Sequence, residues 1–245
     1  MIPRMAFQRA RALLHEAEQI AILTGAGISA ESGVPTFRGE DGLWEQFRPE
    51  DLATPEAFAR DPELVWRWYS WRRARIAEAK PNPGHLALAE IENRSARFTL
   101  ITQNVDGLHQ QAGNRSVLEL HGNIWTLRCT RCTSKWPDRN VLLTIPPYCE
   151  CGAIARPDVV WFGENLPSEI WRSAERAVQS CDILLVVGTS ALVYPAAGLV
   201  PLARSHGAKI MQINTQSTAV SGLVDYALTG PAGKILPQLV AVQNT

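Results

Sequence analysis

An apolar run that leads straight into a glycine-rich turn limits the possible folds of this chain more than any other feature. Residues 20–23 read Ile-Ala-Ile-Leu, and Gly25, Ala26 and Gly27 follow closely. This order predicts a buried parallel strand that ends in a phosphate-binding turn, because glycine lets the backbone turn sharply and approach a ligand. With Ala30 three positions after Gly27, the stretch satisfies the loose Gly-x-Gly-x-x-Ala fingerprint of dinucleotide-binding folds.

The residues after this turn argue against an ordinary dehydrogenase. The fingerprint expects a second strand and a ribose-binding acidic residue about 20 residues further on. Residues 35–55 are instead loop-like and aromatic, and the next strand pattern begins only at Phe98. A bound dinucleotide would therefore be held at its ribose by other groups, and the chemistry need not be hydride transfer. A purely structural glycine turn is the alternative interpretation.

The composition is that of a globular chain with no preference for anionic partners. Its 245 residues can bury a sizeable core as one domain with insertions. The 24 basic and 24 acidic residues cancel, which disfavours a nucleic-acid or anionic-membrane surface, and no apolar run is long enough to span a bilayer. Near the N-terminus, Phe7, Ala10, Leu14 and Ala17 recur with helical spacing, which predicts the first helix of the fold rather than a targeting peptide.

Short, mostly apolar segments with helical patterns between several of them dominate the rest of the chain. The predicted strands are 20–23, 98–101, 117–120, 183–187, 209–213 and 226–228. This alternation predicts an α/β fold with a parallel six-stranded sheet and helices on both faces. Residues 35–83 and 126–157 interrupt the pattern and are interpreted as insertions.

Four of the five cysteines are clustered, which points to a metal rather than to disulfides in a chain without a secretory signal. Cys129 and Cys132 form a C-x2-C half-site for a tetrahedral zinc ion. Cys149 and Cys151 form a C-x-C pair, one residue shorter than usual, whose geometry we expect to be strained. Four sulfur ligands leave no open position, so the predicted zinc is structural. The fifth cysteine, Cys181, is predicted to be buried at the start of a core strand.

Polar side chains follow two predicted strands at their carboxyl ends, where open α/β sheets bind ligands. Gln103, Asn104 and Asp106 come after the second strand and are candidates to hold a ribose and an amide. His121 follows the third strand, where a histidine with an ordinary pKa of about 6.5 can act as a general base. A structural histidine that caps the strand is the alternative, and His109 is a weaker candidate for the base.

Residues 62–79 form a predicted tryptophan-rich helix that carries an arginine on its apolar stripe. The members of this stripe are Val65, Tyr69, Arg72 and Ile76. A guanidinium in that position needs an anionic or hydrogen-bonding partner, and Tyr69 together with Arg72 can hold a ligand carboxylate. An arginine whose charged end reaches water is the alternative. Arg73 and Arg75 are expected to point to solvent.

Three further segments are candidates for ligand contacts. The stretch 35–39, with Phe37 and Arg38 between a proline and a glycine, is interpreted either as a lid or as a surface loop. The extended segment 156–164 either adds a strand to a bound peptide or forms a buried edge strand. Residues 188–190 and 214–215 place small and polar groups at the carboxyl ends of two more strands.

Taken in order, these motifs resemble those of the sirtuins, a family of NAD-dependent protein-lysine deacylases. The matching motifs are 25–29, 35–38, 102–106, 121–122, the four clustered cysteines, 160–164 and 188–190. The resemblance therefore spans nearly the whole chain. Tyr69, Arg72 and Ala53 further resemble the class III branch, which prefers lysines that carry acidic acyl groups such as succinyl or malonyl. The C-x-C pair departs from the family's usual second C-x2-C.

The resemblance implies a Rossmann-like NAD-binding domain and a small lobe, with the substrate in the cleft between them. The domain would comprise 1–34, 84–125 and 158–245, and the lobe would comprise a cofactor loop and helical insertion (35–83) and a zinc-binding module (126–157). Cofactor contacts are implied for Gly25, Ala26, Gly27, Ser29, Thr36, Phe37, Arg38, Gln103, Asn104, Asp106, Gly188, Thr189, Ser190, Asn214, Thr215 and Ala232. Substrate contacts are implied for Tyr69, Arg72, Val160, Trp161, Phe162 and Gly163.

The implied reaction consumes NAD as an activated sugar. The acyl-lysine carbonyl oxygen attacks C1′ of the nicotinamide ribose, nicotinamide leaves, and His121 acts as base on the ribose hydroxyls, which yields lysine and O-acyl-ADP-ribose. The partners would be acylated proteins or peptides, with NAD as co-substrate and one structural Zn²⁺, and without nucleic acid or membrane. The resemblance suggests a cytoplasmic monomer. A general deacetylase, a protein ADP-ribosyltransferase and a non-enzymatic NAD sensor are the alternatives.

Overall fold

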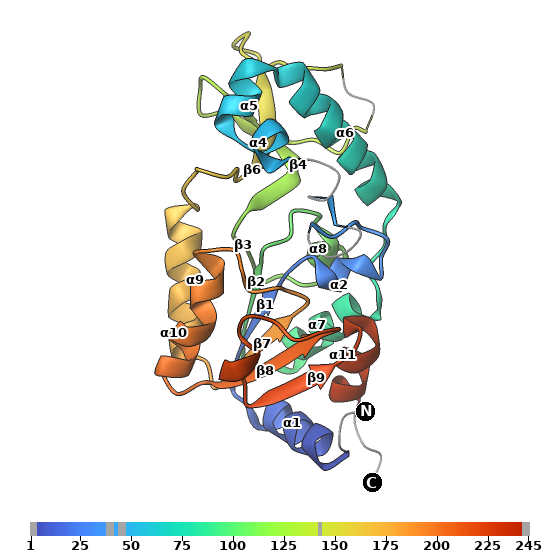
Figure 1. Cartoon of the computed structure of the whole chain (residues 1–245), viewed down its shortest axis with the longest axis vertical. Coiled ribbons are helices and arrows are strands. Elements are labelled where there is room, and N and C mark those ends of the chain that lie inside the picture. The colour runs from blue at the N-terminus through green and yellow to red at the C-terminus, as the bar shows by residue number, and fades with distance from the viewer. Residues whose placement is uncertain (1–3, 38–41, 44–47, 142–143, 242–245) are drawn as a thin grey trace.

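The main sheet of the protein has six parallel strands in the order β3-β2-β1-β7-β8-β9 (Figure 1). The computed structural model describes residues 4–37, 42–43, 48–141 and 144–241. The strands are β1 Gln19–Thr24, β2 Arg97–Thr102, β3 Val117–Glu119, β7 Ile183–Val187, β8 Lys209–Asn214 and β9 Tyr226–Thr229. The predicted fold class is confirmed, and each strand begins and ends within one residue of its predicted bounds.

The strand order reverses between β1 and β7. From β1 the chain moves outward through β2 to β3, and it later returns to β7 beside β1 before it moves outward to β9. All five residues of β7 are buried, as expected of a central parallel strand that is covered on both faces. The loops after β1 and β7 therefore meet at the carboxyl edge of the sheet, which is where open α/β sheets bind ligands.

Helices cover both faces of this sheet. One face packs against α1 Arg4–Glu16, α7 Pro83–Arg94 and α11 Ala232–Val240, and the other against α9 Ser168–Ser180 and α10 Leu199–Ser205 (Figure 1). Leu100 faces the first core and its neighbour Ile101 the second, because side chains alternate along a strand. The short helices α2 Gly27–Ala30 and α8 Leu108–Gln111 and the 3-10 turns Ala196–Gly198 and Ser221–Leu223 lie in connections.

Two expectations about single segments are confirmed. The stripe of α1 lies against the first core, with Ala10 and Leu14 fully enclosed. Cys181, two residues before the start of β7, is 7% exposed and packs in the second core. Among the described residues, no helix is both long and apolar enough to cross a bilayer.

A second group of elements, which we call the upper lobe, lies above the carboxyl edge of the sheet in Figure 1. It consists of α4 Pro49–Leu52, α5 Pro55–Arg60, α6 Pro62–Glu78, β4 Gly122–Cys129, β5 Lys135–Pro137 and β6 Ala155–Val159. The three strands form an antiparallel sheet in the order β5-β4-β6, and a separate hydrophobic core joins them to the helices. Strands β4 and β6 cross the predicted domain boundaries at 125/126 and 157/158, and the division into domains stays a prediction.

Helix α6 is buried on more than one face, which corrects one expectation. The predicted stripe with Tyr69 and Arg72 is buried, and Arg75 is exposed. Arg73 does not point to solvent: its side chain is 0% exposed and donates to Asp138 at 2.6 Å. The reason is that α6 contacts both α5 and β4 of the three-stranded sheet. The side of the helix that carries Arg73 is covered by β4, and the Arg73 guanidinium lies 5.1 Å from the ring centre of Trp125 in that strand.

Candidate functional site

A cavity of about 790 Å³ lies between the carboxyl edge of the main sheet and the upper lobe. Most of the predicted site residues line it. On the predicted cofactor side they are Gly25, Ala26, Gly27, Thr36, Phe37, Gln103, Asn104, Gly188, Thr189, Ser190, Asn214, Thr215 and Ala232. On the predicted substrate side they are Tyr69, Arg72, Val160, Trp161, Phe162 and Gly163, and the predicted base His121 also lines the cavity. Ser29 and Asp106 are not part of this lining, and Arg38 lies outside the described residues. The fold thus brings residues from across the sequence to one cavity.

The loops after β1 and β7 approach each other so closely that glycine is required in both. The backbone N–H of Gly27 donates to the carbonyl of Gly188 at 2.8 Å. A Cβ on Gly27 would lie 2.8 Å from that same oxygen, and a Cβ on Gly188 would lie 2.4 Å from the backbone nitrogen of Ile28. Gly188 also has φ +59, which disfavours any other residue. Gly25, Ala26 and Gly27 of the first loop and Gly188 of the second all line the cavity.

A buried polar network ties the loop after β1 to the loop after β2. Ser29 donates its hydroxyl to Asp106 at 2.8 Å, and Asn104 donates to the carbonyl of Gly25 at 3.1 Å and to the Ser29 hydroxyl at 3.2 Å. The backbone N–H of Leu108 donates to the second oxygen of Asp106 at 2.9 Å. Burial raises the pKa of Asp106 despite these bonds. Ser29 and Asp106 therefore support the cavity from behind.

His121 presents one ring nitrogen to the cavity and is anchored by the other. Its Nδ1 lies 3.0 Å from the carbonyl oxygen of Gln103, which can only accept, so Nδ1 carries the proton and Nε2 is the basic nitrogen. Burial lowers the pKa of His121, against the opposing effect of the Gln103 carbonyl. The ring is therefore neutral near pH 7, which is the form that a general base requires.

Two buried histidines flank the glycine turn on the side away from the cavity. His109, the weaker candidate for the base, is 1% exposed, shares a hydrogen bond of 3.0 Å with Thr24, and is absent from the cavity lining. Its ring centre lies 4.9 Å from that of His85, a residue that the sequence reasoning did not single out. Burial lowers the pKa of His85 to about 4 and that of His109 to about 3. Both rings are neutral at physiological pH.

The side chain of Arg72 enters the cavity wall between aromatic rings. Its guanidinium carbon lies 4.9 Å from the ring centre of Phe37, 4.8 Å from that of Trp68 and 5.5 Å from that of Tyr69. Arg72 is 6% exposed, so the alternative in which its charged end reaches water is wrong. Burial lowers its pKa, opposed by the nearby Tyr69 and Asp106. The wall thus holds a cation that a carboxylate in the cavity can meet.

The segment after β6 forms the opposite part of the same wall. Strand β6 is an edge strand of the three-stranded sheet and ends at Val159. The backbone N–H of Val160 donates to the carbonyl of His121 at 2.9 Å, and that of Phe162 donates to the carbonyl of Ala53 at 2.9 Å. Trp161 is buried and donates its indole N–H to the hydroxyl of Tyr69 at 2.8 Å. The predicted edge strand thus covers 155–159, and the rest of the segment is a turn against the cavity.

The sequence reasoning missed several other residues of the cavity lining. They include Trp68, Val105, the loop Leu192–Pro195 and residues 216–219. Leu192 and Tyr194 are exposed, at 56% and 76%. Only the position of this loop, directly after the turn 188–190, could have pointed to it. Asn82, which supports the loop after β1 from outside the cavity lining, was also missed. It caps α7 and donates to the carbonyl of Ile28 at 2.7 Å, and its position before Pro83 is a recognisable cap signal.

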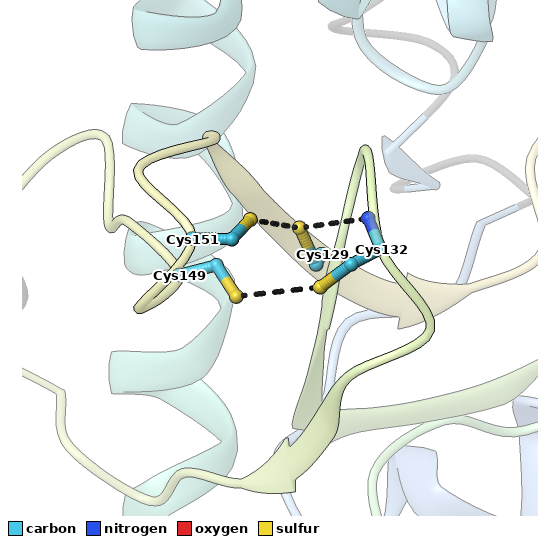
Figure 2. Close-up of side chains that lie close together, drawn as sticks. All are labelled: Cys129, Cys132, Cys149 and Cys151. Carbon is cyan, nitrogen blue, oxygen red and sulfur yellow. Dashed lines mark hydrogen bonds between the residues drawn. The ribbon is translucent and has the colours of Figure 1, made fainter.

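The four clustered cysteines converge in the upper lobe, at and after the end of β4 and in the loop before β6 (Figure 2). Their sulfur atoms all lie within 4.8 Å of one another; Cys129 and Cys151 are 3.5 Å apart, and Cys132 and Cys149 are 3.7 Å apart. A tetrahedral ion with Zn–S bonds of about 2.3 Å requires sulfur separations of about 3.8 Å, so the four thiols fit zinc. The short C-x-C loop is closed by a bond of 2.8 Å from Gly152 N–H to the Cys149 carbonyl, with φ +79 at Gly152.

Comparison with known proteins agrees with this geometry. Residues 25–195 match the Sir2 family. The protein named NAD-dependent protein deacylase 2 of Pyrobaculum aerophilum is 54% identical over 229 residues, which cover 93% of this chain and 92% of that protein. A solved complex of a Sir2 homologue with NAD has a TM-score of 0.90 and 46% identity, and covers 95% of this chain and 92% of that chain. A Sir2 protein bound to a myristoylated histone peptide has a TM-score of 0.80 and 33% identity, and covers 97% and 96%.

The chain therefore belongs to the Sir2 family, the sirtuins, and is of their prokaryotic, class III-like type. The matched residues include the glycine turn, His121 and the four cysteines, so the match covers both the cavity and the predicted metal site.

Proposed function

We propose that this chain is an NAD-dependent protein-lysine deacylase that releases nicotinamide and O-acyl-ADP-ribose. The observation that carries the proposal is that His121, anchored through Nδ1, lines one cavity with the glycine turn and the 160–163 segment. Its neutral ring can take a proton from a ribose hydroxyl at Nε2. Relatives that carry the name NAD-dependent protein deacylase, and the solved NAD and acyl-peptide complexes of family members, support the same reading.

Roles for the remaining contacts follow from their places in the cavity. The turn Gly25–Gly27 would receive the pyrophosphate, because its backbone is free of side chains. Gln103 and Asn104 would position the nicotinamide and its ribose, with Asp106 and Ser29 holding the loop behind them. Ser190, Asn214 and Ala232 would meet the adenosine. The four cysteines would hold one Zn²⁺, which supplies a fixed cross-link between the two ends of the ribbon when bound.

We further propose that the enzyme prefers acyl groups that end in a carboxylate, such as succinyl or malonyl. The support is Arg72, a buried cation in the cavity wall, next to the hydroxyl of Tyr69. A guanidinium can form two parallel hydrogen bonds with a carboxylate, and these are stronger in a site that excludes water.

The test compares nicotinamide release from one peptide that carries either succinyl-lysine or acetyl-lysine. For Arg72→Met we expect kcat/KM for the succinyl peptide to fall roughly 10- to 150-fold, since hydrogen bonds to a charged partner contribute about 1.5–3 kcal/mol. The value for the acetyl peptide should stay within about threefold. Arg75→Met, an exposed position on the same helix, is the matched control and should change neither value.

The outcomes separate the alternatives. Equal use of both peptides by the parent, with little effect of Arg72→Met, identifies a general deacetylase. ADP-ribose that stays on the peptide identifies an ADP-ribosyltransferase. Binding of NAD without any nicotinamide release identifies a sensor.

Partners and location are part of the same proposal. We expect acylated proteins or peptides as substrates and no nucleic-acid or membrane partner, which the balance of 24 basic and 24 acidic residues supports. We expect the protein to be cytoplasmic and monomeric. Light scattering on the purified chain checks the oligomeric state.

A further inference from the structure

The turn 161–164 that follows β6 is held by hydrogen bonds to the side chain of Glu164, its last residue. The carboxylate of Glu164 accepts hydrogen bonds from Arg156 on both oxygens, at 2.6 and 2.9 Å, and one from Arg128 at 3.1 Å. It also accepts the backbone N–H of Trp161 at 2.9 Å, while the backbone N–H of Glu164 donates to the Trp161 carbonyl at 3.0 Å. The carboxylate and this backbone bond together close the turn.

Arg156 holds this carboxylate and at the same time covers the indole of Trp161. Its side chain is 7% exposed, and its guanidinium carbon lies 3.2 Å from the ring centre of Trp161. It also donates to the carbonyl of Val159 at 2.7 Å. A desolvated guanidinium over an indole face is an attractive contact that fixes the orientation of the ring.

The other contacts of the indole lead to the cavity wall. Trp161 donates its ring N–H to the hydroxyl of Tyr69 at 2.8 Å, and its ring centre lies 5.2 Å from that of Phe58. Tyr69 in turn lies beside Arg72. A shift of the indole would therefore move the Tyr69 hydroxyl and, through it, the part of the wall that faces the acyl group.

We propose that Glu164 and Arg156 are positioning residues for the acylated lysine, which act by fixing the Trp161 indole and the Tyr69 hydroxyl in the cavity wall. This inference rests on the proposed function, since it concerns the acyl-lysine side of the same site. It predicts that loss of the pair weakens binding of the acyl peptide and leaves binding of NAD unchanged, because neither residue contacts the glycine turn or the polar network behind it.

The pair also depends on the metal end of the upper lobe. Arg156 of β6 lies opposite Arg128 of β4, and the next register pair joins Ala155 to the metal-site residue Cys129. Both guanidiniums that reach Glu164 are thus carried by the two strands that the cysteine cluster joins. Loss of the metal from the cysteine cluster should therefore weaken peptide binding rather than NAD binding.

The test measures binding of each ligand separately and without turnover. A fluorescein-labelled peptide with one succinyl-lysine is titrated by anisotropy, and NAD is titrated by calorimetry, on the zinc-loaded chain. Glu164→Gln removes the charge, and Glu164→Asp keeps the charge but shortens the reach to Arg156. We expect the Kd of the peptide to rise about tenfold in both variants, the change expected when one charge-assisted hydrogen bond is lost, and the Kd of NAD to stay within about twofold.

Lys135→Gln is the matched control. It removes the ion pair from Lys135 to Asp158 at 2.8 Å on the same sheet. Asp158 keeps its ion pair with Arg128 at 3.9 Å, and Glu164 keeps both of its arginines, so neither Kd should change. Zinc content and the thermal unfolding midpoint are recorded for each variant. If Glu164→Gln does not fold because Arg156 is left buried without a counter-charge, Glu164→Asp decides the test.

The outcomes distinguish this inference from the proposed function. A peptide Kd in Glu164→Asp within twofold of the parent, or a parallel rise in the Kd of NAD, overturns the inference while the parent still releases nicotinamide. If the parent binds the peptide and the Glu164 variants show the expected rise in peptide Kd, but the parent releases no nicotinamide, the inference stands and the proposed deacylase activity is wrong. A parent that does not bind the peptide removes both.

Discussion

The carboxyl edge of the main sheet and the upper lobe form the two sides of one cavity by different physical means. At the sheet edge, backbones meet directly: Gly27 N–H bonds Gly188 at 2.8 Å, and the side chains behind them are mostly neutral hydrogen-bonding groups. In the upper lobe, guanidiniums lie on aromatic rings, as with Arg72 on Trp68 and Arg156 on Trp161.

This difference separates two kinds of specificity. The sheet edge fixes backbone groups at set distances, which suits a ligand that is always the same molecule. The upper lobe buries guanidinium groups against aromatic rings, which suits the recognition of a ligand group, such as an acyl chain, by its charge. Changes at the sheet edge should therefore alter NAD affinity, and changes in the upper lobe should alter peptide affinity.

Removal of zinc should give the largest effect and should be confined to the peptide side. Structural zinc contributes on the order of 10 kcal/mol to the folding of small zinc modules. We expect Cys129→Ala to abolish the one equivalent of bound zinc, to unfold the three-stranded sheet and to eliminate peptide binding, as measured by metal analysis and anisotropy. Cys181→Ala, a buried cysteine outside the cluster, should retain zinc. An equal loss of NAD affinity would break the comparison.

Gly27→Ala should have the converse effect. The new Cβ would lie 2.8 Å from the Gly188 oxygen, and overpacking of this kind costs about 3 kcal/mol. We expect a lower free energy of unfolding and at least a tenfold higher Kd for NAD, with peptide affinity retained. Gly222→Ala is the control, because a Cβ there meets no heavy atom within 4 Å. Calorimetry and denaturant titration measure both quantities.

Acid should destabilise the sheet edge through its buried histidines. The folded pKa of His109 is about 3, below the unfolded value of about 6.5, so the unfolded chain binds more protons between these pH values and stability falls as pH drops below 6.5. Between pH 7 and pH 5 this histidine should contribute a loss of about 2 kcal/mol. His109→Gln should remove that part of the pH dependence.

The control for the acid effect is the exposed His206 at the end of α10. His206→Gln should keep the pH dependence of the parent, measured by urea denaturation at pH 7 and pH 5. A slope in His109→Gln equal to that of the parent would show that His109 does not carry the part of the effect assigned to it.

The smallest expected effect concerns the helix that bounds the adenosine end. Glu31, directly after α2, accepts the backbone N–H of Gly233 in the first turn of α11 at 2.8 Å. Glu31→Gln should lower the free energy of unfolding by about 0.5 kcal/mol, since an acidic group at a helix start contributes about that much. The difference should shrink in 1 M salt, where exposed charges are screened. A loss that does not respond to salt would indicate packing instead.

The strands and the metal ligands could be predicted because each is a local pattern. Buried parallel strands such as β7 are continuous apolar runs, and thiolates for one ion come in short spacings. The helical spacing of α6 is also a local pattern, and it placed Tyr69 and Arg72 on one face of the helix. Both residues line the cavity, which agrees with that placement.

What could not be predicted depends on contacts between distant segments. Arg73 was expected to be exposed because helical spacing defines faces but does not say how many of them are covered. The positions of Ser29 and Asp106 behind the cavity depend on a bond that joins residues 77 positions apart. His85 was not singled out, and its place follows from its hydrogen bonds with Asn82 and Ser29 and from its ring contact with His109.

Strand β4 carries a further consequence. It begins one residue after His121 and ends at Cys129. At about 3.3 Å per residue, this strand keeps the metal roughly 20 Å or more from the histidine. The ion therefore stabilises the upper lobe at a distance and does not take part in the reaction at His121. Any tetrahedral thiophilic ion that fits, such as Co²⁺, should preserve turnover and report the integrity of the fold by its colour.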